Sequence, residues 1–499
     1  MRILLKGFIA DGSGKEPSRG ALLFENGKII ALEKDITGTS AADKIYSFDD
    51  EIISPGFIDV HGHSDLSLMS APSAFSKRSQ GVTTEISGNC GLSAYPVTEK
   101  NLYHLKELYS NYPEQINWQN HASYHRQLSA KNPALRMYTL CGHNTLRAAV
   151  AGYEKRSLSA SETEQMCTML EAELNSGALG LSTGLLYTPG CFASDDELLE
   201  LMKILAANDC VYATHLKSEG DQLLESLTAT LELAREAGLK RVQISHFKTA
   251  GKKNWHKLGE ALELFEYYRS CGIDVHIDRY PYTESQTMLS VALPPPWSET
   301  GDVELKKQLS LPGECEKLLA ELRIYRDENY WQNIRLTATA HPHWHHYCGR
   351  KICDISNDPA ALTVELLAYD APSAMMGASV MSEENMKRIL ALPYCCCGSD
   401  GNAVPQDMPF GTVHPRSFGA AAKFMRLLLD SSAGIGEACR RMSGMPAQFF
   451  KLQGTGILKP GFRADITVFN PETVNSTADF TNPSVPASGI IMSFSGLEQ

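Results

Sequence analysis

Eight short apolar runs, each followed by a helical or loop-rich stretch, constrain the fold more than any other feature of this sequence. The runs are Phe57–Val60, Val82–Ser87, Leu135–Leu140, Ala178–Ser182, Val211–His215, Arg241–His246, Asp274–Asp278 and Cys395–Ser399. Strands that alternate with helices pair in parallel, because each helix returns the chain to the same edge of the sheet. Eight such units predict an α/β fold, specifically a (β/α)8 TIM barrel, rather than an open sheet.

The helices between these runs carry start signals of their own. Ser161-x-x-Glu164 and Ser194-x-x-Glu197 are candidate capping boxes, in which the serine and the glutamate satisfy the free N–H groups of a helix start. They predict helices that begin at these two serines.

The two ends of the chain differ from this alternating middle. Residues 1–54 and 456–499 read as short strands broken by Gly and Pro, with Asn26-Gly27 as a hairpin turn. We expect the two ends to form one small β-sandwich domain beside a catalytic barrel at 55–455. The interval after the seventh run is too long for one helix, so we interpret residues 284–350 as an insertion and a candidate lid.

Composition excludes several classes of partner. Asp and Glu outnumber Lys and Arg by 58 to 46, a net charge of −12, which argues against nucleic acid and anionic membranes as partners. No run of about 18 apolar residues is present to span a bilayer. Thirteen cysteines, an odd number without a disulfide framework, favour a reducing cytoplasm. The oligomeric state stays open.

Potential metal ligands stand at or just beyond the ends of five predicted strands. They are His61 and His63, Cys90, His215, His246 and Asp400. The carboxyl ends of parallel barrel strands meet on one face, and side chains at i and i+2 of a strand point to the same side. Imidazole, thiolate and carboxylate donors together suit zinc. One such residue would carry no weight, but six at the same end of the barrel predict a metal site.

These residues resemble a known family. The pattern is similar to the amidohydrolase superfamily of metal-dependent hydrolases, and within it to the D-aminoacylase (N-acyl-D-amino-acid deacylase) group. The strand-four region Ala178–Tyr187 lacks the metal-bridging lysine of most of that superfamily, whereas Gly88-Asn-Cys-Gly91 matches the cysteine of this group. Further matches are Gly142–Arg147, Ser182–Leu185, Thr214–Glu219, Ser245–Lys248, Asp278–Tyr282 and His414-Pro-Arg416.

The resemblance implies that the six ligands form two metal positions. Cys90, His215 and His246 would hold one zinc tightly, and His61, His63 and Asp400 would frame a second, weaker position. Zinc lowers the pKa of bound water to about 7, which would supply hydroxide as the nucleophile. Asp400 would then act as general base towards the water and as general acid towards the departing amine.

The resemblance also implies how a small-molecule substrate is held. Lys248, Tyr280 and Arg416 would clamp the carboxylate of an N-acyl amino acid, and Tyr187 would be a pocket wall or an oxyanion donor. The Pro-rich stretch Leu293–Trp297 offers no cation for an acidic side chain, so we expect neutral or hydrophobic substrates. The D configuration follows from the resemblance alone.

The sequence leaves two alternative functions open, and it contains one histidine cluster and one buried glutamate whose roles it does not decide. The protein could be another amide hydrolase of the superfamily (hydantoinase, isoaspartyl dipeptidase or dihydroorotase-like), or a catalytically dead barrel that acts as a binding protein. The His341–His346 cluster lies off any predicted strand, and we interpret it as part of a lid or surface rather than a metal site. Glu85 lies inside a buried strand, where a carboxylate needs a partner that the sequence does not identify.

Overall fold

Two parallel sheets contain the eight predicted runs in a computed structural model that describes residues 1–34, 42–110, 112–406 and 413–497. The first has the order β5 (Phe57–Asp59), β6 (Val82–Ser87), β7 (Arg136–Thr139). The second contains, in spatial order, β16 (Cys395–Cys397), β12 (Asp274–Arg279), β11 (Arg241–Ile244), β10 (Val211–His215), β9 (Gly180–Gly184) and β8 (Cys141–Gly142). The predicted α/β class with parallel strands is confirmed.

The two sheets meet at both of their edges. β7 and β8 are separated only by Leu140, whose N–H donates to the carbonyl of Ser87 at 2.9 Å. At the other edge, Val60 N donates to Cys397 O at 3.0 Å, and Gly62 and Gly401 form a parallel bridge. The first and last of the eight runs are therefore neighbours in space.

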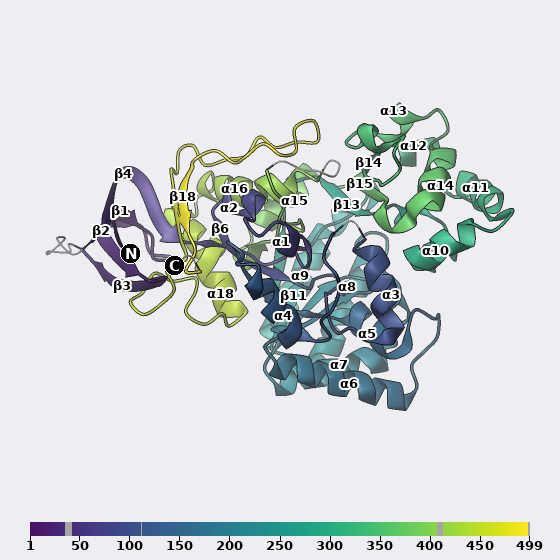
Figure 1. Ribbon diagram of the computed structural model, residues 1–499, viewed down its shortest axis with the longest axis horizontal. Coiled ribbons are helices and arrows are strands. Elements are labelled where there is room, and N and C mark those ends of the chain that lie inside the picture. Colours follow the sequence, from purple (N-terminus) through teal and green to yellow (C-terminus); the bar gives the residue numbers. More distant parts are fainter. Residues whose placement is uncertain (35–41, 111, 407–412, 498–499) are drawn as a thin grey trace.

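A row of amphipathic helices covers the outside of these strands (Figure 1). The row consists of α5 (His143–Ala151), α6 (Ala160–Asn175), α7 (Asp195–Ala207), α8 (Leu223–Glu236) and α9 (Leu258–Ser270), each packed on the next. α7 begins at the predicted cap, where Ser194 Oγ accepts from Glu197 N at 3.2 Å. The prediction for α6 is wrong by two residues, because Ser159 and Glu162 form its capping box.

The other helices beside the parallel strands are shorter or lie later in the chain. They are α1 (Ser67–Ser70), α2 (Phe75–Arg78), α3 (Glu99–Leu108), α4 (His121–Ala130), α15 (Glu383–Leu390), α16 (Arg416–Leu429), α17 (Gly434–Cys439) and α18 (Met445–Phe449). In the part of the chain that the structure describes, no helix is both long and apolar enough to cross a membrane.

Both ends of the chain share one six-stranded sheet, which lies at the left of Figure 1. Its spatial order is β18 (Ile490–Phe494), β17 (Ile466–Phe469), β4 (Lys44–Pro55), β1 (Arg2–Ile9), β2 (Ser18–Glu25) and β3 (Lys28–Glu33). The hairpin turn predicted at Asn26-Gly27 joins β2 to β3, with both residues at positive φ. The sheet packs its own apolar core, including Leu5 and Val468. Its arrangement as a two-layered sandwich stays a prediction.

The long interval between β12 and β16 has a sheet and a core of its own. β13 (Glu284–Met288), β14 (Ile334–Ala338) and β15 (Met375–Ser379) pair antiparallel in the order β13-β15-β14. The same interval contains five helices that share one apolar core with β14 and β15. They are α10 (Asp302–Leu309), α11 (Glu314–Tyr325), α12 (Glu328–Trp331), α13 (Ile352–Ile355) and α14 (Pro359–Asp370). The segment projects at the upper right of Figure 1, on the side opposite the terminal sheet.

Candidate active site

The six predicted ligands lie together at the carboxyl ends of the parallel strands. One group of donor atoms comes from His61, His63, Cys90 and Asp400, and a second comes from Cys90, His215 and His246. Within each group all donor atoms lie within 4.8 Å of one another. Cys90 belongs to both groups, so its thiol is the link between two adjacent positions.

Three of these residues adopt a left-handed backbone conformation, which residues other than glycine rarely adopt. φ is +54° at Cys90, +35° at His246 and +53° at Asp400. Each of the three lies two or three residues beyond the end of its strand, in the loop that forms the site. Such conformations persist where the surrounding structure holds them, and they are concentrated at functional sites.

Asp278 orients the ring of His61. Both side chains are fully buried, and Nδ1 of His61 lies 3.2 Å from the Asp278 carboxylate. A proton on Nδ1 leaves Nε2 free as a lone-pair donor, and Nε2 lies 3.4 Å from Cys90 Sγ. Asp278 also accepts from Gln243 Nε2 at 2.7 Å and from His246 N at 2.8 Å, so it joins two ligand-bearing strands.

The surroundings of Cys90 favour the thiolate. Burial acts to raise the pKa of Cys90, but the neighbouring His61 and His246 outweigh it and hold that pKa well below its usual value. A thiolate among imidazoles is a metal ligand or a nucleophile. Here Sγ lies 3.4 Å from Nε2 of His61 and 3.4 Å from Nε2 of His246, which favours the first role.

His215 supplies a test of whether a metal fits. Both of its ring nitrogens are buried, and neither has a hydrogen-bond partner within the described residues. Glu219 Oε2 lies 3.8 Å from Nε2, beyond hydrogen-bond distance. Buried polar atoms without a partner are rare, because each costs about 1–3 kcal/mol. A cation beside Cys90 and His246 would satisfy His215, and this nitrogen and sulfur donor set suits zinc better than magnesium or calcium.

Asp400 lies between His63, a candidate metal ligand, and the guanidinium of Arg416. Its Oδ1 is 3.0 Å from His63 Nε2, and its Oδ2 is 2.7 Å from Arg416 Nη1. Burial would raise the pKa of Asp400, but Arg416 and the hydrogen bond with His63 lower it well below its ordinary value. Asp400 is therefore ionised at neutral pH, which is the form that a general base requires.

The predicted substrate-binding side chains surround the same site. The Tyr280 hydroxyl is completely buried without a hydrogen-bond partner in the described structure, and the Arg416 guanidinium lies 4.8 Å from the centre of its ring. Lys248 Nζ lies 2.8 Å from His246 Nδ1. The Tyr187 ring packs edge-on against His215 at 4.9 Å, while its hydroxyl is 3.0 Å from Thr287 Oγ1.

A cavity of about 470 Å³ adjoins this site. Tyr187 forms part of its wall, as do Leu92, two residues beyond Cys90, and Lys217, two residues beyond His215. The segment from the start of β13 to the end of β15 (the 284–379 segment) supplies another part of the lining, including Met288 and Leu293. The position of the cavity suits a binding site for the part of a substrate that extends away from the reacting bond.

Glu85 has the partner that the sequence did not identify. Lys77 on α2, fully buried, lies 2.9 Å from the Glu85 carboxylate and donates to Asp59 at 2.6 Å. The same ammonium donates to Ser399 Oγ and to the carbonyl of Gly401, on either side of Asp400. A Cβ at Gly62 would lie 2.1 Å from the Glu85 carboxyl carbon, which explains the glycine between His61 and His63.

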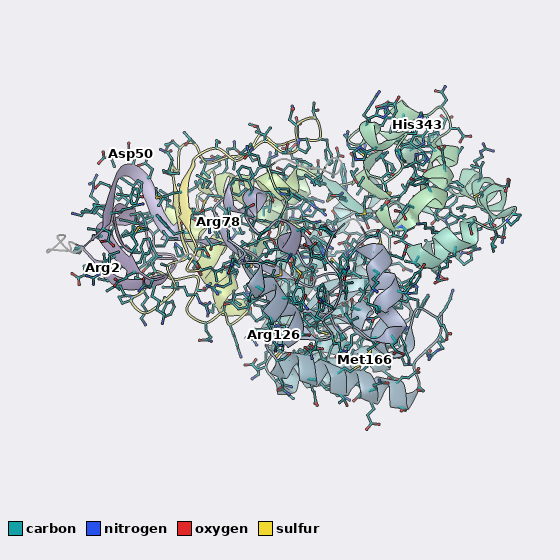
Figure 2. All side chains as sticks on the ribbon, viewed as in Figure 1. Arg2, Asp50, Arg78, Arg126, Met166 and His343 are labelled. Atoms are coloured by element: carbon teal, nitrogen blue, oxygen red, sulfur yellow. The ribbon has the colours of Figure 1, made fainter. Side chains whose placement is uncertain are left out.

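The histidine-rich stretch His341–His346 lies apart from the site, in the loop after β14. His343 is at the outer edge of the 284–379 segment (Figure 2). His341 Nε2 is 3.6 Å from the Glu365 carboxylate, and its ring packs against Tyr369. Among the described residues, neither of the two groups able to hold a metal includes a histidine from this stretch.

Sequence reasoning missed two residues that support the site. Asp278 was noted only as the start of a motif, although a carboxylate at the end of the seventh strand is a signal for this role. Lys77 carried no signal, since it lies on a helix of four residues.

A parallel α/β arrangement that gathers histidines, a cysteine and a carboxylate at the carboxyl ends of its strands is typical of metal-dependent hydrolases. Comparison with known proteins agrees. The model of the amidohydrolase family matches residues 49–304. Two similar proteins from Alcaligenes xylosoxydans xylosoxydans are an N-acyl-D-glutamate deacylase (31% identical, 97% of this chain and 90% of the relative) and a D-aminoacylase (30%, 98% and 92%).

A solved structure is also similar over nearly the whole chain. It is the N-acyl-D-glutamate deacylase of Bordetella bronchiseptica, in complex with zinc and a phosphonate inhibitor that mimics the tetrahedral intermediate of the reaction. The TM-score is 0.82 at 29% identity, covering 99% of this chain and 95% of the other. The chain therefore belongs to the amidohydrolase family, and within it to the D-aminoacylase group.

Proposed function

We propose that this protein hydrolyses the amide bond of N-acyl-D-amino acids to a carboxylate and a free D-amino acid. The observation that carries the proposal is the convergence of Cys90, His215 and His246, with both His215 nitrogens buried and without a hydrogen bond in the described structure. The similar proteins include deacylases of N-acyl-D-amino acids, which supports the D configuration.

Cys90, His215 and His246 would hold one zinc tightly, and His61, His63 and Asp400 would hold a second more weakly. When bound, zinc would polarise the amide carbonyl and lower the pKa of the attacking water. Asp278 keeps the Nε2 lone pair of His61 directed at the site, through its contact with Nδ1.

Asp400 is the residue that moves the proton. Because its pKa is held low, its carboxylate is ionised at neutral pH and can accept a proton from water. The same carboxyl group then donates that proton to the departing amine nitrogen. Arg416 and His63 hold Asp400 in place from two sides during both transfers.

The substrate carboxylate would be bound by Lys248, Tyr280 and Arg416. The buried Tyr280 hydroxyl and the Arg416 Nε are both donors without a partner in the described residues, which supports this role. Arg416 offers one nitrogen to Asp400 and retains another for the substrate.

The adjoining cavity favours a neutral or hydrophobic substrate side chain. Leu92, Leu185, Met288 and Leu293 form part of its wall. Of its two lysines, Lys155 is already paired with Glu299, and Lys217 is exposed to solvent at the wall. Asp302 also lines the cavity and disfavours an acidic side chain.

The proposal extends to architecture and setting. The two parallel sheets would form one closed (β/α)8 barrel at 55–455, supported by the bonds between β5 and β16, with a small domain at 1–54 and 456–499. We place the end of the insertion at residue 379 rather than 350, because β15 pairs with β13 and β14. The cytoplasmic location and the lack of nucleic-acid and membrane partners stay predictions.

Hydrolysis of N-acetyl-D-amino acids and their L enantiomers, with zinc measured on the same sample, tests the proposal. We expect turnover of neutral D substrates only, and loss of turnover with retained zinc in Asp400→Asn. Absence of turnover of every D substrate by zinc-loaded protein would contradict the proposal.

A further inference from the structure

Glu219 is a carboxylate inside the site that the proposed chemistry does not use. It lies four residues beyond His215, in the loop after β10. Its Oε1 accepts from Lys248 Nζ at 2.5 Å and lies 2.9 Å from His246 Nδ1. Lys248 Nζ and His246 Nδ1 are themselves only 2.8 Å apart, so the three polar atoms form a closed triangle.

The triangle allows two arrangements of protons. In the first, His246 carries its proton on Nδ1, and both this N–H and Lys248 donate to Glu219. In the second, Nδ1 carries no proton and accepts from Lys248, so the ring proton moves to Nε2. His246 Nε2 lies 3.4 Å from Cys90 Sγ, on the side where the other candidate ligands converge.

Only the first arrangement leaves His246 able to bind a metal, since a ring nitrogen that carries a proton has no lone pair to donate. Lys248 favours the second arrangement, because its ammonium group needs an acceptor. The side chains of Lys248 and His246 are 5% and 3% exposed, so water cannot readily supply one. Glu219 provides an acceptor for both nitrogens at once.

We infer that Glu219 is a positioning residue that accepts the hydrogen bond of Lys248 in place of Nδ1 of His246. Nδ1 can then keep its proton, and His246 stays in the tautomer that binds metal. The inference rests on the proposed function in two respects, the metal site at His246 and the retention of Lys248 for the substrate carboxylate. Glu219 thus allows a substrate-binding cation and a metal ligand to lie within 3 Å of each other.

Zinc affinity of purified full-length variants, measured by competition with a chromophoric chelator, tests the inference without using activity. We expect Glu219→Ala to bind zinc about 10- to 100-fold more weakly than wild type. Lys248→Met alone should bind zinc like wild type, because Glu219 still accepts from Nδ1. Glu219→Ala combined with Lys248→Met should recover most of the affinity, because the competing donor is gone.

A purely structural role for Glu219 predicts a different pattern, in which the double variant is at least as impaired as Glu219→Ala. That result, or wild-type affinity in Glu219→Ala, would overturn the inference. Glu225→Ala, an exposed glutamate in the first turn of α8, is the matched control and should change nothing. If Glu219→Ala does not fold, Glu219→Gln replaces it, with a smaller loss and the same rescue expected.

The same measurements separate this inference from the proposed function. Zinc affinity that is unchanged in Cys90→Ala would overturn the metal site and the inference together. Zinc affinity that falls in Cys90→Ala but not in Glu219→Ala would overturn the inference alone.

Discussion

The carboxylate of Asp278 lies 3.2 Å from Nδ1 of His61, and both side chains are fully buried. Carboxylates in this position fix the tautomer of a metal-binding histidine and increase its basicity. Asp278 also accepts from Gln243 and from the backbone of His246, so one side chain connects ligands that come from two different strands.

Asp278→Asn should lower zinc affinity by about 10- to 100-fold and reduce the free energy of unfolding by about 1–3 kcal/mol. An amide offers one acceptor atom where three donors now meet a carboxylate. Metal analysis after dialysis and urea unfolding measure the two effects. Asp274→Asn, on the same strand but half exposed, is the control; equal zinc contents in the two variants would refute this role for Asp278.

Lys77→Met should destabilise the fold by about 3–5 kcal/mol, because it leaves Asp59 and Glu85 buried without their cation. Adding Glu85→Gln should restore part of the loss by removing one of the two charges. Lys203→Met breaks an exposed pair with Glu200 and should cost less than about 1 kcal/mol. Urea unfolding compares the variants, and similar losses at Lys77 and Lys203 would be inconsistent with a buried ionic cluster.

Glu173 should make stability depend on pH. Burial raises the pKa of Glu173 to about 7, against the weaker opposing effect of the bond from His121 N. Because the pKa is raised, the neutral carboxyl stabilises the fold fully when the pH is below the ordinary glutamate pKa of 4.5. This contribution is lost as the pH rises through about 7.

Glu173→Gln should therefore match wild type near about pH 4 and exceed its free energy of unfolding by up to about 3 kcal/mol at about pH 8. Urea unfolding at both pH values measures the difference, with Glu171→Gln on the exposed face of the same helix as control. A difference between Glu173→Gln and wild type that does not change with pH would show that the carboxyl titrates normally.

Tyr187→Phe distinguishes the two roles predicted for this residue. The hydroxyl is already 3.0 Å from Thr287 Oγ1, and the ring lines the cavity, which favours a wall. We expect kcat to fall by less than about tenfold, whereas loss of an oxyanion donor costs about 10²- to 10³-fold. Steady-state kinetics on one N-acyl-D-amino acid decide between them.

The sequence reveals strands and ligands better than it reveals their partners. Strands buried on both faces are rich in apolar residues, so the sequence predicts all eight, and the histidines, Cys90 and Asp400 stand at or just beyond their ends. The contact between His61 and Asp278 joins residues 217 positions apart, and no local pattern reports such a pairing.

Local signals also fail where two readings are equally good. Ser159-x-x-Glu162 and Ser161-x-x-Glu164 both match the capping-box pattern, and the structure uses the first. The extent of the segment after β12 depends on β15, which pairs with β13 about ninety residues earlier. Helix starts and sheet partners of this kind are decided by tertiary structure.

The proposed zinc site depends most on Cys90, because Cys90 belongs to both groups of candidate ligands. The most direct test is a zinc titration of metal-free wild type and Cys90→Ser, with turnover of an N-acetyl-D-amino acid measured at each step. We predict that wild-type activity rises with the first equivalent of zinc and that Cys90→Ser stays inactive throughout. Activity without zinc, or equal activation of both proteins, would contradict a zinc site built on Cys90.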